Sequence, residues 1–186
     1  MVYKDETLTF ASDKIYYSDS DTTYEVMMDW EDDIMKASAD YVCEGGGDIL
    51  EIGFGMGISA NYIQANSITS HTIVENHPQV IERAKAWAVG KSNVTIVEGD
   101  WYTIKDSLST YDGIFYDTWG DDDTDHFVDV LPTLAKSGAR TTWWNNYTNS
   151  DDVFFVNGTT YESISVNPPS NVYFNSNIYY LPKKQF

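Results

Sequence analysis

The sequence predicts an α/β fold in which a mostly parallel sheet of seven strands is covered by helices on both faces. Apolar, strand-like stretches alternate with amphipathic, helix-like stretches from residue 48 to residue 146, which is typical of parallel strands joined by crossover helices. Three glycines (Gly53, Gly55 and Gly57) follow the first of these strands. Two strand-like stretches without an intervening helix close the chain, and they predict an antiparallel hairpin.

The first elements surround the glycines. Residues 25–42 space apolar side chains on one helical face from Val26 to Ala37, and Gly45-Gly46-Gly47 ends that helix. Residues 48–52 form a short apolar strand, and residues 58–65 are compatible with a helix.

The remaining elements continue the alternation. Strands are expected at residues 71–75, 93–99, 111–119 and 139–146. Helices are expected at residues 78–89, with Pro78 in the first turn, and at residues 123–135, where Pro132 disturbs the last turn. The hairpin strands are expected at residues 160–166 and 171–182, joined by a turn at Asn167-Pro168-Pro169-Ser170.

Size and charge limit the classes of partner. At 186 residues the chain is expected to form one domain over residues 1–186. Its 29 Asp and Glu outnumber 11 Lys and Arg, which gives a formal net charge of −18. This charge repels phosphate backbones and anionic lipid, so it argues against nucleic acid and membrane as partners and suits a small cationic substrate. A solvated acidic surface adapted to salt is the alternative.

Targeting and redox signals are weak. The beginning of the chain, MVYKDETLTF, has no apolar signal segment, and no stretch reaches membrane-spanning length, so a cytoplasmic location is expected. Cys43 is the one cysteine, which excludes an internal disulfide. The oligomeric state is not indicated.

The glycine-rich turn predicts a ligand site. Glycine inside a regular element costs roughly 0.5–1 kcal/mol relative to alanine. Here it brings backbone N–H groups and a helix N-terminus to the switch point of the sheet, where ligands bind. The spacing G-x-G-x-G lacks the third glycine of the dinucleotide fingerprint, which would fall at Ile58. Glu51, two residues before the first glycine, is characteristic of the turn that binds S-adenosylmethionine (SAM).

Two further acids fit a SAM site. Glu75 ends the second strand, where a carboxylate can accept both ribose hydroxyls. Asp100 follows the third strand, where it can meet the adenine amino group. Each acid alone could simply belong to the acidic surface of this protein. Together, Glu51, Glu75 and Asp100 at successive strands favour a SAM-binding site.

Several segments carry a resemblance to a known family. They are VMMDWEDDIM, LEIGFGMGIS, IVEN, GDW, GIFYDTW, NNYT and, more weakly, NPPSNVYF, which span residues 26 to about 180. With them the chain resembles guanidinoacetate N-methyltransferase and the related arginine-delta methyltransferases. The resemblance implies a Rossmann-like class I methyltransferase fold, SAM as cofactor and S-adenosylhomocysteine as product. It also implies methyl transfer to a nitrogen of a guanidino or related cationic small molecule.

The cofactor residues follow from the glycine turn, the two acids and this resemblance. They are Met27, Met35, Glu51, Gly53, Phe54, Gly55, Met56, Gly57, Ile58, Glu75, Asn76, Asp100 and Trp101. Residues 53–58 would hold the methionine part, Glu75 the ribose, and Asp100 with Trp101 the adenine.

The resemblance also implies an acceptor site. Glu31 and Asp117 would grip the guanidino group, and the main chain at Tyr147 and Thr148 would receive the substrate carboxylate. A guanidinium is a poor nucleophile because it is charged and its nitrogen lone pairs are delocalised. Carboxylates that hold it bidentately orient one nitrogen, and Asp117 would accept the released proton. The alternative is that Glu31 simply lies on the solvent-exposed face of a helix.

The sequence departs from the family near its beginning. The family usually places an aromatic residue, commonly Trp, in an N-terminal segment that closes over the active site. No Trp precedes Trp30 here, so Phe10, Tyr16 or Tyr17 would have to serve in a lid formed by residues 1–25. Two alternatives stay open: a SAM-binding protein without turnover, which this altered segment makes plausible, and a dinucleotide-dependent oxidoreductase, which Ile58 at the place of the third fingerprint glycine disfavours.

No metal site is expected. The three histidines (His71, His77 and His126) lack metal-ligand spacing with one another. Asp121-Asp122-Asp123 is a candidate weak cation site, although a helix N-cap with a solvated run is the favoured interpretation. Core or sheet packing is expected of Trp87, Trp143 and Trp144.

Overall fold

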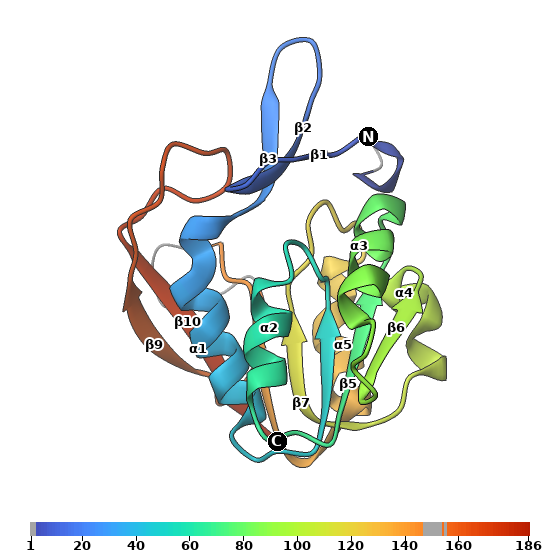
Figure 1. Cartoon of the computed structure of the whole chain (residues 1–186). Helices are drawn as coiled ribbons and strands as arrows, with labels where there is room; N and C mark the ends of the chain where they lie inside the picture. The colour runs from blue at the N-terminus through green and yellow to red at the C-terminus, as the bar shows by residue number, and fades with distance from the viewer. Residues whose placement is uncertain (1–2, 147–153, 155) are drawn as a thin grey trace.

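The centre of the fold is a seven-stranded sheet in the computed structural model, which describes residues 3–146, 154 and 156–186 (Figure 1). Its strands are β4 (Asp48–Ile52), β5 (Ser70–Glu75), β6 (Val94–Glu98), β7 (Tyr111–Tyr116), β8 (Ala135–Trp143), β9 (Thr160–Ser165) and β10 (Ile178–Gln185). They lie in the order β6-β5-β4-β7-β8-β10-β9. Neighbouring strands in the part of this order from β6 through β5, β4 and β7 to β8 pair in parallel. Strand β10 pairs antiparallel with both β8 and β9. The predicted sheet with a C-terminal antiparallel hairpin is confirmed.

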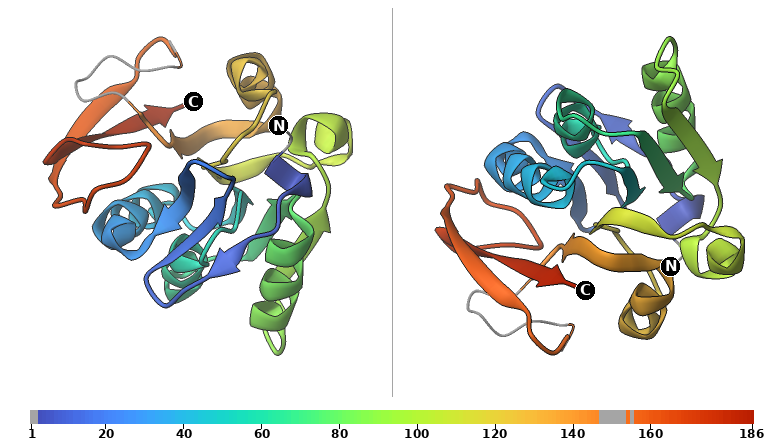
Figure 2. Two further views of the ribbon diagram at one scale, coloured as in Figure 1. Left: turned by 90° about the horizontal axis from the view of Figure 1, so that it is seen from above. Right: turned by 90° about the horizontal axis from the view of Figure 1, so that it is seen from below.

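Helices cover both faces of the sheet, as the views from above and below show (Figure 2). They are α1 (Asp32–Cys43), α2 (Ile58–Ala65), α3 (Pro78–Ala88), α4 (Trp101–Ile104) and α5 (Phe127–Leu134). Successive strand residues point to opposite faces. Ile49 and Phe115 pack with residues of α1 and α2, whereas Leu50 and Ile114 pack with residues of α5. Burial on both faces explains the nearly continuous apolar runs in these strands.

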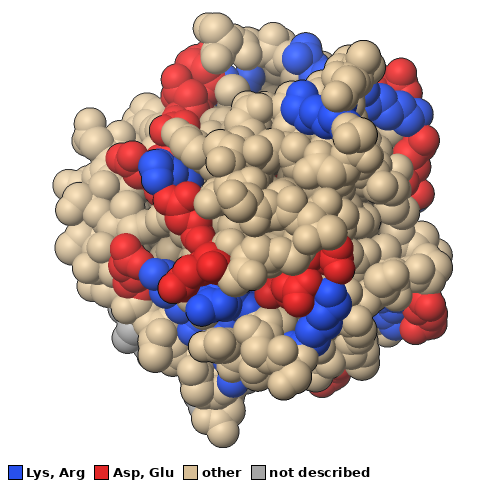
Figure 3. Space-filling model, turned by 60° about the horizontal axis from the view of Figure 1, so that its bottom comes forward, with Lys and Arg blue, Asp and Glu red and all other residues tan. Residues whose placement is uncertain are grey.

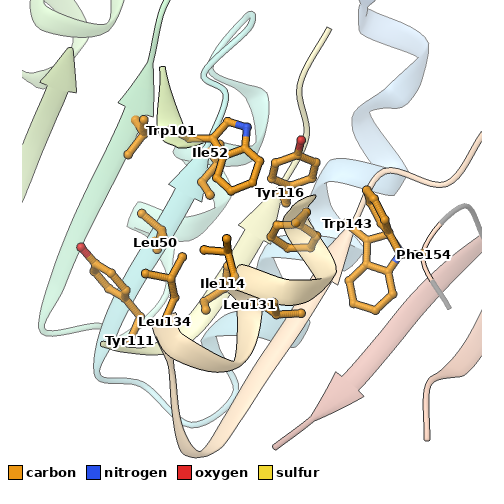
Figure 4. Close-up of a cluster of buried hydrophobic side chains, with 13 residues drawn as sticks. Leu50, Ile52, Trp101, Tyr111, Ile114, Tyr116, Leu131, Leu134, Trp143 and Phe154 are labelled. Carbon is orange, nitrogen blue, oxygen red and sulfur yellow. The ribbon is translucent and has the colours of Figure 1, made fainter. Parts of the chain in front are cut away.

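The face toward α4 and α5 is packed with aromatic rings (Figure 4). Tyr116 stacks on Phe127 with ring centroids 4.1 Å apart, and Trp101 meets Tyr116 edge-on at 5.4 Å. Trp143 is fully buried in this cluster, as the sequence predicted. Trp101 and Tyr116 stand next to the carboxyl ends of β6 and β7, so the core on this face also forms part of the site wall.

A three-stranded antiparallel sheet forms the described N-terminal part and lies above the carboxyl ends of the central strands (Figure 1). Its strands are β1 (Thr9–Phe10), β2 (Lys14–Ser18) and β3 (Thr23–Met28), and the short 3₁₀ helix η1 (Tyr3–Asp5) precedes them. The prediction that the first helix includes Val26 and Met27 is wrong. Their stretch pairs with β2, where Met27 lies opposite Ile15, and the α-helix starts at Asp32 after one 3₁₀ turn, η2 (Asp29–Glu31).

The C-terminal hairpin also differs in extent from its prediction. The second strand starts at Ile178 rather than at residue 171. The side chain of Asn171 accepts hydrogen bonds from the N–H groups of Tyr173 and Phe174 at 2.9 Å and 2.7 Å, which turns the chain away from the extended form. This turn directs Tyr173 toward the carboxyl ends of the parallel strands.

Smaller boundary shifts occur elsewhere. Strand β7 ends at Tyr116, so Asp117 stands just beyond it, and β8 begins at Ala135. The predicted helix at residues 123–135 is observed as a 3₁₀ turn, η4 (Thr124–His126), followed by α5 with Pro132 inside it.

Within the described ranges, no helix has both the length and the apolar character needed to cross a bilayer. The cytoplasmic location and the single domain over residues 1–186 stay predictions.

Candidate active site

Two adjoining cavities lie at the carboxyl ends of β4, β5 and β7. The first lies over the glycine-rich turn, and the second extends toward Trp144, Phe154 and Tyr173. Both are lined by Val26, Glu31, Asp117, Thr118, Trp119 and Asp121. A ligand in the first cavity would therefore meet a ligand in the second beside these shared side chains, at the edge of the sheet where α/β folds bind ligands.

The glycine-rich turn has a conformation that other residues rarely adopt. Gly53 has φ +94° and Gly55 has φ +52°. A Cβ on Gly53 would lie 1.9 Å from the carbonyl oxygen of Asp117, and one on Gly55 would lie 2.4 Å from Sδ of Met27. The glycines thus allow the turn to pack directly against Met27 and the main chain of Asp117.

Glu75 lies between the turn and the first cavity. Its Oε2 accepts the N–H of Phe54 at 3.0 Å, and its Oε1 accepts the N–H groups of Asn76 and His77 at 2.9 Å and 2.8 Å. Burial raises the pKa of Glu75, and these N–H donors oppose the rise. A carboxylate has about four acceptor positions, so one is left for a ligand hydroxyl.

Trp101 and Asp121 form another wall of the first cavity. The indole N–H of Trp101 donates to Oδ2 of Asp121 at 2.6 Å, and the hydroxyl of Tyr116 donates to the same oxygen at 2.5 Å. Asp121 lines both cavities. Sequence reasoning considered it only as part of an acidic run, although its position after Trp119-Gly120 at a strand end was a usable signal.

The acidic run does not form the predicted helix cap. Oδ1 of Asp121 accepts the N–H of Asp123 at 2.8 Å, and the Asp123 side chain caps nothing. Asp100 lies nearby, and one carboxylate oxygen each of Asp100, Asp121 and Asp123 lie within 4.8 Å of one another. Asp100 itself caps α4 by accepting the N–H of Thr103 at 2.8 Å, and it lines neither cavity.

The structure divides the sequence-predicted cofactor residues into two groups. The first cavity is lined by Met27, Gly53, Phe54, Gly55, Glu75, Asn76 and Trp101. The residues that line neither cavity are Met35, Glu51, Met56, Gly57, Ile58 and Asp100. Met35 is fully buried between α1 and the sheet, so packing accounts for it. Glu51 is also fully buried; it accepts a hydrogen bond from Ser59 and lies 2.9 Å from Nε2 of His71.

Glu31 and Asp117 meet where the two cavities join. Oε1 of Glu31 accepts the N–H of Met28 at 2.7 Å. Burial and the charge of Asp117 raise the pKa of Glu31 to about 8. Burial and the charge of Glu51 raise the pKa of Asp117 to about 7. Because neither acid forms an ion pair with a described lysine, arginine or histidine, a cation between them would relieve their repulsion.

Tyr173 is a site residue that sequence reasoning missed. Its hydroxyl donates to Oε1 of Glu31 at 2.6 Å, across 142 positions of the chain. The segment NPPSNVYF gives only a weak family match, and its residues 171–174 are expected in a strand, so local spacing does not predict the turn that makes this contact. The hydrogen bond favours the ionised form of Glu31 and fixes its orientation.

Replacing Tyr173 by Phe is expected to shift the pH dependence of this site. Loss of a hydrogen bond to a charged group raises the pKa of Glu31 further, so the pH midpoint of kcat/KM should rise by about one pH unit. Tyr62→Phe is the matched control because the Tyr62 hydroxyl donates to the exposed Asp32 at 2.8 Å. An unchanged midpoint in Tyr173→Phe would contradict the assignment.

The aromatic residue over the first cavity is also not one of those expected. Tyr3 lines it and stacks on Trp119 with ring centroids 6.2 Å apart. Phe10 instead packs on the guanidinium of Arg83 at 3.7 Å. The cavity beneath Tyr3 has a volume of about 60 Å³.

Two other expectations concern the second cavity. Trp144 was expected only to pack, but it also lines this cavity. The predicted carboxylate site at Tyr147 and Thr148 lies outside the described residues.

Comparisons with known sequences fit this arrangement. The sequence model of the guanidinoacetate N-methyltransferase family matches residues 5–156. A protein arginine N-methyltransferase 2 of Yarrowia lipolytica is 36% identical over 152 residues, covering 70% of this chain and 32% of that protein. One of Aspergillus oryzae is 39% identical over 152 residues, covering 77% of this chain and 36% of that protein. The chain spans about a third of the length of these curated relatives.

A solved structure supports the fold independently. A precorrin-6y C5,15-methyltransferase of Geobacter metallireducens is similar with a TM-score of 0.61, covering 83% of this chain and 87% of that one. At 15% identity this likeness shows the fold alone. The fold is the Rossmann-like class I methyltransferase fold, as predicted.

Proposed function

The chain belongs to the guanidinoacetate N-methyltransferase family, a family of SAM-dependent methyltransferases, and from this premise we propose that it transfers a methyl group from SAM to a nitrogen of a guanidino compound. The observation that carries the proposal is the position of Glu31 and Asp117 at the junction of the two cavities. There they can hold a guanidino group beside a cofactor that lies on the glycine-rich turn.

The first cavity offers the groups that SAM needs. The main chain at Gly53 and Gly55 would lie against its methionine part, Glu75 would accept from one of its ribose hydroxyls, and Trp101 would face its adenine. When bound, SAM supplies a methyl group on a sulfonium, ready for in-line attack. The present volume of about 60 Å³ is small beside the roughly 300 Å³ or more of ligand sites, so we expect Tyr3 to move when SAM enters.

The two acids have different surroundings, which suggests different roles. Glu31 is 3% exposed and its Oε1 already accepts two hydrogen bonds, so it is suited to orient the guanidino group. The carboxylate of Asp117 accepts none of the hydrogen bonds found among the described residues. Because a guanidinium has a pKa above roughly 12, the methylated nitrogen must lose its proton to a positioned base. We assign that role to Asp117.

The two alternatives to methyl transfer are not equally supported. Family membership argues against a dinucleotide-dependent oxidoreductase, because the family is one of methyltransferases. A SAM-binding protein without turnover would share the first cavity but would not need the acid pair.

The deciding experiment measures binding and transfer on the same sample. SAM binding is measured by calorimetry, and transfer is measured as S-adenosylhomocysteine formed with guanidinoacetate, arginine, agmatine or an arginine-containing peptide. The proposal expects product with at least one acceptor. Tight SAM binding without product from any of them would favour the binding protein, and a lack of SAM binding would refute the proposal.

The acid pair predicts a definite pH dependence. Both carboxylates must be ionised to hold a cation, and their pKa values are about 7 and about 8. For the free enzyme, kcat/KM is therefore expected to level off above pH 8 and to fall by up to about tenfold per pH unit between pH 8 and pH 7, where Glu31 takes up a proton. Below pH 7 Asp117 is protonated as well, so the fall should approach about a hundredfold per pH unit. A flat profile between pH 6 and pH 8 would contradict this assignment.

A further inference from the structure

We propose that the acceptor is a guanidinoalkylamine, a small guanidino compound whose other end is a cation and which has no carboxylate. This inference rests on the proposed function, and it concerns the charge of the second cavity. It departs from the guanidino acid that the family resemblance implies.

The charged side chains that line the second cavity are all acidic. They are Glu31, Asp117 and Asp121, and no lysine, arginine or histidine lines it in the part of the chain that the structure describes. Among these described lining residues, a carboxylate on the acceptor would find no cationic side chain.

Several basic residues outside the cavity are paired with acids. Lys14 lies 3.5 Å from Glu25. Lys136 binds Asp48 and Asp112 at the opposite end of the parallel strands, at 2.8 Å and 2.7 Å. Figure 3 shows the lower face of the molecule, where blue side chains lie among red ones. These pairs lie at residues that do not line the cavity, so they offer no counter-charge to an acceptor carboxylate.

A balance of charges favours a second cation on the acceptor. With Glu31, Asp117 and Asp121 ionised, a guanidinium leaves two negative charges uncompensated. An amine at the other end reduces this excess, whereas a carboxylate increases it. In a partly buried site such charges interact strongly at an effective dielectric constant of about 20.

The walls of the cavity suit a cationic tail. Asp121 is held in place by Trp101 and Tyr116, so its charge has a fixed position. The rings of Trp144 and Tyr173 line the same cavity, and aromatic faces attract cations. Its volume of about 300 Å³ is in the range of sites for small ligands.

The test compares three acceptors with similar four-carbon chains and different tails. Agmatine ends in an amine, butylguanidine in a methyl group, and 4-guanidinobutyrate in a carboxylate. Their dissociation constants are measured by calorimetry with S-adenosylhomocysteine present. Agmatine is expected to bind at least about tenfold more tightly than 4-guanidinobutyrate, with butylguanidine between them. Equal affinities, tighter binding of the acid, or no binding of any compound would overturn the proposal.

A charge introduced at the rim provides a second test. Asn146 lines the cavity and is exposed, so Asn146→Lys places a cation at the rim. Its Oδ1 accepts the indole N–H of Trp144, so Asn146→Gln, which keeps an amide oxygen, is the uncharged control and Asn146→Met shows the effect of losing that contact alone. The lysine variant should bind agmatine more weakly and 4-guanidinobutyrate more tightly, and the glutamine variant should keep the wild-type order. An unchanged order in Asn146→Lys would overturn the proposal.

Turnover separates this proposal from the function on which it rests. If the predicted order of affinities is found but no compound is methylated, the methyl-transfer proposal fails and the charge selectivity holds. If 4-guanidinobutyrate is bound and methylated best, the methyl-transfer proposal holds and the charge selectivity fails. An arginine peptide with uncharged neighbours that binds more tightly than agmatine would also overturn the assignment to a small diamine-like compound.

Discussion

Asp117→Asn is expected to lower kcat/KM for methyl transfer by on the order of 10²-fold or more and to leave SAM affinity nearly unchanged. The variant keeps the size of the side chain and one acceptor oxygen, but it removes the charge that holds a guanidinium and the base that takes its proton. Steady-state kinetics and calorimetry on one preparation measure both quantities. Wild-type turnover in a folded variant would exclude the proposed role of Asp117 in holding and deprotonating the guanidino group.

The control removes a charge near the start of β7, the strand whose end Asp117 follows. Asp112→Asn in β7 removes the charge that pairs with Lys136 and keeps an oxygen that can accept the N–H of Asp48, so it should lower stability but not transfer. Glu31→Gln should resemble Asp117→Asn. The double variant should lose less than the product of the two single losses, because the two acids act on one group.

Stability gives an independent signature of the same charge. The pKa of Asp117 rises from 3.8 to about 7 on folding, so the folded chain binds this proton more tightly than the unfolded chain. That contribution to stability is complete below about pH 4 and is lost as the pH rises through about 7. Asn cannot ionise, so the Tm of Asp117→Asn relative to the wild type should be higher at pH 8 than at pH 5. A purely structural Asp117 would instead give a variant of lower Tm at both values.

Much of the fold was predictable because strands that are buried on both faces have neighbouring apolar residues in the sequence. The runs at residues 48–52 and 71–75 contain neighbouring apolar residues, Ile49-Leu50 and Ile73-Val74, and the glycines at residues 53–57 mark the turn after the first run. Met27 was misread because apolar residues at two successive positions fit a helix face as well as the end of a strand. Its pairing with Ile15 decided the outcome, and that contact is not visible in local spacing.

The residues of the candidate site that could be predicted from the sequence are those located at the ends of strands. Glu75 and Asp117 stand there and line the cavities. Glu51 also follows the pattern, but full burial beside His71 places it behind the site, where its charge acts on Asp117. Tyr173 reaches Glu31 only through the Asn171 turn, and Tyr3 reaches the first cavity only through the N-terminal sheet. Such contacts depend on tertiary structure, so no sequence window contains them.

Glu75→Ala is the second variant with a large expected effect, because three N–H donors and the proposed ribose site depend on one carboxylate. Hydrogen bonds to a charged group contribute roughly 1.5–3 kcal/mol, so the SAM dissociation constant should rise about ten- to a hundred-fold. Tm should also fall, since the Phe54 N–H in the turn loses its acceptor.

Glu98→Ala separates recognition by Glu75 from a general effect of charge. Glu98 lies directly beside Glu75 in the sheet register, but its side chain is exposed and pairs with Lys85 at 2.9 Å. Both variants remove one negative charge from neighbouring strand ends, yet only Glu75 lines the cavity. Calorimetry should therefore show wild-type SAM affinity in Glu98→Ala and weakened affinity in Glu75→Ala. Equal weakening in the two variants would mean that SAM senses the acidity of this edge of the sheet rather than an acceptor at Glu75.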